Sequence, residues 1–187
     1  MYFNNPAANY VSDSMAEVGY LTPNENYFYK AILYVMKKTL FNFNKFYVFV
    51  VCTDDPKWVK HNFEPARLIA FAKTRKVPKK TIELIEKIVR FEIMQNITAR
   101  DKALCLLTLM DHMIMSVGTF GWWAAFLNEN NFKYFCTQKM NNPASCIAPK
   151  KPILIYFKTP FREGSPVSAY FSLEDHFPSR WIGISSD

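Results

Sequence analysis

The residues best suited to chemistry form a short hydroxyl-bearing turn over residues 116–120. Ser116, Gly118 and Thr119 follow an apolar run and precede an aromatic one. Gly118 permits a sharp turn or a close approach to a ligand, and Thr119 is expected to cap a helix that runs to Leu127. Unbonded amides at a helix start, with two hydroxyls beside them, suit a diphosphate. The alternative is a packing unit whose hydroxyls only cap the helix.

The elements that must position this turn are predicted from the spacing of apolar residues. We expect helices over 26–40, 78–92, 99–110 and 119–127, and strands over 46–52, 68–71, 112–115 and 132–136. One more helix begins at Pro56, with Thr53 or Asp54 as its cap. This alternation predicts an α/β fold, a Rossmann-like parallel sheet flanked by helices.

Two segments stand apart from this alternation. Residues 1–22 show no sustained period and are expected to be irregular, which leaves 23–187 as one domain. The stretch after 136 contains many prolines and is expected to wrap the surface until Trp181 anchors it.

Composition restricts the class of protein. At 187 residues and 50% hydrophobic the chain can bury a core, so disorder is not expected outside its ends. The net charge of +7 indicates an anionic partner, which could be a nucleotide diphosphate, a nucleic acid or a membrane surface. A basic cluster is more typical of a solvated helix face than of a nucleic-acid surface; it comprises Lys73, Arg75, Lys76, Lys79 and Lys80.

The cysteines and the ends of the chain carry weaker signals. No C-x-x-C pair is present and no His stands at ligand spacing from a cysteine, so a zinc site is not expected. Cys136 and Cys146 could form a disulfide in an oxidising compartment, where the acceptor pattern Asn96-Ile97-Thr98 would also matter. No stretch approaches the roughly 20 apolar residues of a membrane span, and the start lacks a signal-peptide pattern.

The segment from Asp111 to Leu127 closely resembles the most recognisable motif of the galactoside alpha-1,2-fucosyltransferases, glycosyltransferase family 11. Segments 27–32, 48–56 and 177–184 also resemble that family, in the family's order. The resemblance implies that 23–187 is the nucleotide-sugar-binding domain, the C-terminal or donor half of a GT-B glycosyltransferase.

The activity implied is transfer of L-fucose from GDP-fucose to a galactose hydroxyl on a glycan acceptor, with inversion, without a metal or other cofactor, and with no nucleic acid as partner. The resemblance places the donor's phosphates at Ser116, Gly118, Thr119 and Phe120. Asp54 would border the pocket, although a helix cap is its alternative role. The catalytic residue is not identified.

The resemblance also implies a location. Such proteins are anchored in the Golgi membrane by one N-terminal helix, with the catalytic domain on the lumenal side. This chain shows no such anchor, so we expect a truncated product, a fragment or an incomplete gene model.

Two departures from the family pattern lower the expected activity. The family's His-x-Arg-Arg-x-Asp motif is replaced at residues 4–9 by Asn, Pro and Ala, which removes a guanidinium that would neutralise the diphosphate. A family Asp is replaced by Ala103, and Asp101 lies two residues earlier, about 200° around a helix. Asp101 joins the donor site only if the helix starts later or bulges; otherwise it is a cap.

We therefore expect reduced or no transfer by this chain. A non-catalytic nucleotide- or glycan-binding module is the alternative, and a basic nucleic-acid binder is a further one.

Overall fold

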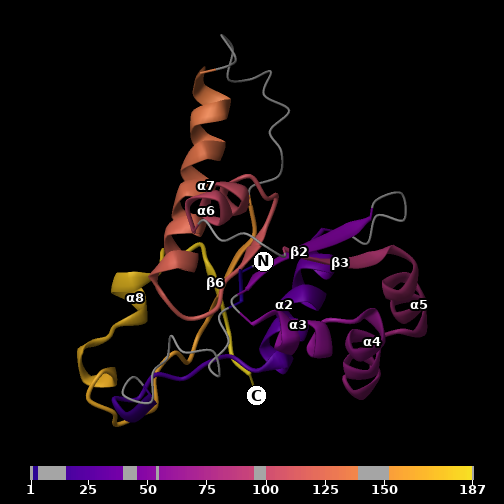
Figure 1. The fold of residues 1–187 in the computed structure, drawn as a ribbon, viewed down its shortest axis with the longest axis horizontal. Helices are drawn as coiled ribbons and strands as arrows, with labels where there is room; N and C mark the ends of the chain where they lie inside the picture. The colour runs from indigo at the N-terminus through magenta and orange to yellow at the C-terminus, as the bar shows by residue number, and fades with distance from the viewer. Residues whose placement is uncertain are drawn as a thin grey trace.

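The computed structural model describes residues 2–3, 16–39, 46–53, 55–94, 100–138 and 152–186. They form a mixed α/β protein with two small parallel sheets and surrounding helices (Figure 1). The first sheet has the order β1-β2-β3 and comprises β1 (Tyr2–Phe3), β2 (Tyr47–Thr53) and β3 (Val89–Ile93). The second has the order β4-β5-β6 and comprises β4 (Met113–Ile114), β5 (Leu154–Phe157) and β6 (Ile182–Ile184).

The two strand orders are the two halves of one known pattern. Placed edge to edge at β1 and β4, they would read 3-2-1-4-5-6, the order of the dinucleotide-binding Rossmann sheet. Within the described residues no ladder joins β1 to β4. The predicted α/β class with parallel strands is confirmed, and the topology is compatible with a Rossmann-like fold.

Helix α2 (Glu25–Lys38) lies between the two halves and confirms the helix predicted over 26–40. It contacts β4, β6 and α4 (Pro65–Thr74). Asn24 caps it, because its side chain accepts a hydrogen bond from the Tyr27 N–H at 3.3 Å. One apolar cluster contains buried side chains of α2 and of both sheets, so the halves share a core.

Helix α3 (Pro56–Asn62) follows β2, but its cap differs from the prediction. The Asp55 carboxylate accepts hydrogen bonds from the N–H groups of Lys57 and Trp58 at 3.0 and 2.9 Å. The prediction that Thr53 or Asp54 caps this helix is therefore wrong. The Thr53 hydroxyl instead accepts from the Asp55 N–H at 3.0 Å, and Asp54 lies outside the described residues.

Two further predictions in the first half are wrong. The strand expected over 68–71 is part of α4, which begins at Pro65 and buries Leu68 and Ala72 on one face. The helix expected over 78–92 divides into α5 (Lys79–Ile88) and β3. Residues 89–92 continue the apolar spacing of the predicted helix, but in the structure they pair with β2.

In the second half, α6 (Arg100–Thr108) and the strand β4 confirm the elements predicted over 99–110 and 112–115. Helix α7 (Thr119–Gln138) is much longer than expected, so the strand predicted over 132–136 is wrong. The Asn128 amide, buried on α7, donates to the carbonyls of Thr108 and Met110 at 3.0 and 2.6 Å. That side chain fixes the end of α6 against the middle of α7.

The two end segments are more ordered than predicted. Residues 2–3 form β1, so the first 22 residues are not irregular throughout. The segment expected to wrap the surface supplies β5 and β6, together with the short helices η2 (Ser168–Tyr170) and α8 (Leu173–His176). Trp181 is buried, which confirms its predicted role as an anchor.

Candidate functional site

The candidate site begins where β4 delivers the chain to residues 116–120, called here the donor loop. The Met115 N–H donates to the Ile155 carbonyl at 2.9 Å, so pairing with β5 extends to the residue before the loop. Met113, Ile114 and Met115 are buried. The loop therefore starts at the carboxyl end of a rigidly held parallel strand, where open α/β sheets bind their ligands.

The backbone of the donor loop is set by Gly118, whose φ of +116° L side chains rarely adopt. No atom lies within 4 Å of the place where a Cβ would be, so the backbone angle and not crowding requires glycine here. Within the described part of the chain, the N–H groups of Val117, Gly118 and Thr119 donate no hydrogen bond to any protein acceptor. They stand at the N-terminus of a 20-residue helix, where an anion is stabilised.

The two hydroxyls of the loop are placed differently. Ser116 is 7% exposed, and its hydroxyl lies 3.4 Å from the Val117 carbonyl. Thr119 is exposed and is the first helical residue of α7, so Gly118 and not Thr119 occupies the cap position. The predicted capping role of Thr119 is therefore wrong.

Phe120 and the residues after it join the loop to a second apolar cluster. Phe120, Trp122 and Phe126 pack there against the buried Trp181 and half-buried Phe177. The two stretches that resemble the fucosyltransferases, 111–127 and 177–184, thus meet in one place. Phe120 is held by packing.

The adjacent tryptophans of α7 face different surroundings. The Trp122 indole N–H donates to the His176 carbonyl at 2.7 Å, whereas Trp123 is 51% exposed. The loop is therefore tied to α8 through Trp122.

Of the two carboxylates predicted for the site, the described structure shows only Asp101, and no contact brings it to the loop. Asp101 is exposed on α6 as the second helical residue, so it is not the cap of that helix. Within the described residues its carboxylate has neither a hydrogen bond nor an ion pair. Asp54 lies outside the described residues, so its place at the pocket stays a prediction.

Tyr27 supports the donor loop from below, a role that the sequence argument missed. Its hydroxyl donates to the Met115 carbonyl at 2.5 Å, and its ring packs edge-on against Phe28 and Phe157. Burial raises the pKa of Tyr27 well above its usual value, so the hydroxyl remains a donor. The sequence does place this tyrosine on the apolar face of a helix. A buried tyrosine hydroxyl requires a hydrogen-bond partner, so that position could have indicated a supporting contact.

His112 supports the same strand from the other end. Its Nδ1 accepts a hydrogen bond from the Ile153 N–H at 3.1 Å, so the ring is neutral with its proton on Nε2. Burial lowers the pKa of His112, and the neighbouring Asp111 charge opposes that shift. The imidazole thus acts as a structural acceptor between β4 and β5.

Among the residues that the structure describes, no three His, Cys, Asp or Glu side chains gather where they could hold a metal ion. None of the described helices combines the length and apolar character needed to cross a bilayer.

Comparison with known proteins identifies the family. The family model for glycosyl transferase family 11 matches residues 8–149, more than half of the chain, and includes the donor loop and α7. The resembling segment 177–184 lies outside the matched range. A search of curated proteins found no match, and a search of solved structures also found none. Because the family match covers most of the sequence and contains the loop described above, this chain belongs to glycosyl transferase family 11.

Proposed function

We propose that the chain is the donor-binding part of a GDP-fucose-dependent transferase of the galactoside alpha-1,2-fucosyltransferase type. Family membership supports a glycosyltransferase that uses a nucleotide-sugar donor and a glycan acceptor. The choice of GDP-fucose, of a galactose hydroxyl as acceptor and of an inverting displacement rests on the resemblance of residues 111–127. The same resemblance supports a GT-B arrangement, with 23–187 as the donor half, and a Golgi lumenal location.

The observation that carries this proposal is the geometry of the donor loop. Transfer of a sugar leaves negative charge on the departing diphosphate, and fixed donors aimed at that charge lower the barrier. The amides of residues 117–119 lie together at the start of α7, without protein acceptors in the described structure. The Thr119 hydroxyl is exposed beside them. We propose that Ser116, Gly118, Thr119 and Phe120 form the diphosphate cradle, and that no metal ion takes part.

The lost arginine motif favours a second candidate function. Residues 4–9 carry no cation, so the bidentate contact to the diphosphate is missing while the loop remains. Loop amides would stabilise the bound nucleotide and the transition state alike. The arginine would place positive charge where negative charge develops on the departing diphosphate. Binding of GDP with little or no transfer would make the chain a nucleotide-binding module.

A pair of glycine variants tests the cradle. Gly118→Ala should weaken GDP binding by about tenfold or more, because the added Cβ disfavours a φ of +116° and shifts the amides. Gly164→Ala is the matched control, since Gly164 also has a positive φ, of +73°, and also has no atom within 4 Å of its Cβ position. Calorimetric titration of GDP measures both, and the control should bind like the unaltered chain.

The outcomes separate the candidates. GDP binding together with transfer of labelled fucose from GDP-fucose to lactose supports the enzyme, and GDP binding without transfer supports the module. Equal weakening by both variants would mean that general destabilisation and not loop geometry controls binding. Absence of GDP binding by the unaltered, folded chain would refute the donor-site proposal.

A further inference from the structure

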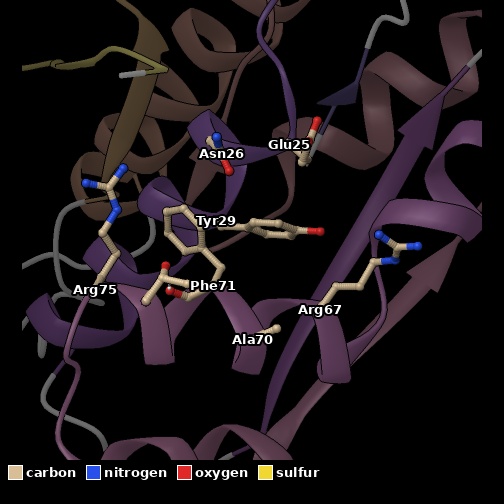
Figure 2. Close-up of a pocket in the computed structure, with 8 residues that line it drawn as sticks. Glu25, Asn26, Tyr29, Arg67, Ala70, Phe71 and Arg75 are labelled. Atoms are coloured by element: carbon tan, nitrogen blue, oxygen red, sulfur yellow. Dashed lines mark hydrogen bonds between the residues drawn. The ribbon is translucent and has the colours of Figure 1, made fainter.

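A second concave site lies between α2 and α4, as Figure 2 shows. Its cavity has a volume of about 520 Å³, within the range of small-molecule sites. Its walls combine cationic, acidic, amide and aromatic side chains: Glu25, Asn26, Tyr29, Arg67, Phe71 and Arg75. Figure 2 shows Arg67 and Arg75 at opposite ends, with the rings of Tyr29 and Phe71 between them.

This cavity is separate from the donor loop. Tyr27 and Tyr29 are two positions apart on α2, and two helical residues rotate a side chain by about 200°. Tyr27 reaches the Met115 carbonyl before the loop, whereas Tyr29 packs on Phe71 of α4 with ring centroids 5.3 Å apart. The two sites therefore lie on opposite sides of the same helix, and the cavity does not belong to the diphosphate cradle.

The residues that line the cavity carry a net positive charge, because two arginines stand against one glutamate. The Arg67 guanidinium lies 3.0 Å from Nε2 of His61, and that of Arg75 lies over the Phe71 ring at 5.3 Å. Neither guanidinium forms an ion pair within the described residues. Glu25 is the single acidic side chain among the residues that line the cavity. An anion entering here would meet two guanidinium forks suited to carboxylate or sulfate.

The remaining wall selects the chemistry of that anion. The Thr74 hydroxyl donates to the Phe71 carbonyl at 2.7 Å, so it offers an acceptor. The Asn26 amide offers hydrogen bonds to hydroxyl groups, and the half-buried Phe71 ring offers an apolar surface. A simple inorganic anion uses neither feature, and a long acidic peptide does not need a cavity of this size. We propose that the cavity binds an acidic saccharide, one or two sugar rings that carry a carboxylate or sulfate.

This proposal goes beyond the transfer of fucose to a galactose hydroxyl. It gives the chain a second glycan-binding surface, which would select substrates or surroundings rich in acidic sugars. The choice of a saccharide over other organic anions rests on membership of a glycosyltransferase family and not on the identity of the donor. It therefore stands or falls independently of GDP binding.

The test compares two disaccharides that lack galactose and differ by one carboxylate. Cellobiouronic acid should bind the full chain at 0.15 M salt, and cellobiose should bind at least tenfold more weakly, by calorimetry or by NMR of the ligand. Arg67→Gln and Arg75→Gln should each weaken binding of the acid, because each removes positive charge from the cavity. The loss should be about fivefold or more in the variant whose guanidinium pairs with the single carboxylate, since the two guanidinium groups stand at opposite ends. Lys73→Gln is the control, since Lys73 is an exposed cation on the same helix outside the cavity.

Each outcome decides. Circular dichroism checks that each variant folds. If Arg67→Gln does not fold, Arg75→Gln is the variant that tests the proposal. Equal binding of cellobiose, equal weakening by Lys73→Gln, or binding of inorganic sulfate or a glutamate peptide as tight as that of cellobiouronic acid would each overturn the proposal. Unchanged GDP affinity in the arginine variants is expected, and a matching loss of GDP affinity would show that the cavity is part of the donor site.

Discussion

At the scale of single residues, the donor loop depends on backbone geometry supported from outside. Gly118 provides the positive φ, and the carbonyl just before Ser116 is held by the Tyr27 hydroxyl. Residue types alone indicated the loop, because a glycine between hydroxyls before a helix is locally readable. They did not indicate Tyr27, whose partner lies 88 residues away in the chain.

His112 makes the stability of the protein depend on pH. Histidine in an unfolded chain titrates near pH 6.5, and burial holds the pKa of folded His112 lower. Between those two values the unfolded state binds more protons. Stability should therefore be full above about pH 7, fall as the pH drops through 6.5, and level off below the folded pKa. Urea unfolding at a series of pH values measures this slope.

A matched pair of variants assigns that slope to one ring. His112→Asn keeps an acceptor near the position of Nδ1 for the Ile153 N–H but does not titrate, so the slope between about pH 5 and 7 should flatten. His61→Asn, which removes an exposed histidine, is the comparison. An unaltered slope in His112→Asn would show that other groups are responsible.

At the scale of elements, prediction succeeded where local pattern and tertiary partner agree. The helix over 26–40 and the strand over 46–52 have long apolar patterns, and α2 and β2 follow them closely. Short apolar runs were ambiguous. Residues 68–71 became helix because Pro65 starts α4, and 89–93 became strand because β2 offers a neighbour, which no local pattern reveals.

The site shows the same division. The turn over residues 116–120 could be predicted from local residue types, and its role at the donor stays a prediction. The role of Asp101 depended on transferring a family pattern to a helix whose start the sequence did not fix. That start, at Arg100, leaves Asp101 exposed and one residue beyond the first helical position.

The pairing of β5 with β6 contains a close contact that can be measured. Gly183 lies opposite Tyr156, and a Cβ added there would lie 2.9 Å from the end of the tyrosine ring. That ring cannot easily move, because it is stacked on Phe177 with centroids 3.9 Å apart. Gly183→Ala should therefore destabilise the protein by about 1–3 kcal/mol in urea unfolding.

The double variant isolates the cause. In a Tyr156→Leu background the crowding ring is absent, so the added cost of Gly183→Ala should fall below about 0.5 kcal/mol. Equal cost in both backgrounds would place the effect in the backbone and not in contact with Tyr156.

At the scale of the whole molecule, the class of fold was predictable and the arrangement of its sheets was not. Alternating strands and helices indicated parallel βαβ units, and all the ladders between the described strands are parallel. The division into two sheets with α2 packed across them depends on contacts between distant segments. Two residues are enough for β1, and so short a strand leaves no readable periodicity.

The shared core predicts that both halves unfold together. Trp58 packs on the first apolar cluster, and Trp122 and Trp181 lie in the second. In Trp58→Phe, tryptophan fluorescence reports only on the second half. Because α2 and buried residues of both sheets form one cluster, this fluorescence should follow the same urea transition as the circular dichroism of the variant. Trp181→Phe removes the buried anchor of the second half, and its urea transition is compared with that of Trp58→Phe. Two separated transitions in Trp58→Phe would show that the halves are independent.

The position of Tyr27 and Tyr29 on one helical turn has a thermodynamic consequence. The first touches the strand end that leads to the proposed diphosphate cradle, and the second lies in the wall of the arginine-lined cavity. If a ligand on one side of the helix changes the conformation of that turn, it changes the binding free energy of a ligand on the other side. The coupling free energy is the same in both directions. Whatever factor an acidic sugar applies to the dissociation constant of GDP, GDP must apply the same factor to the sugar.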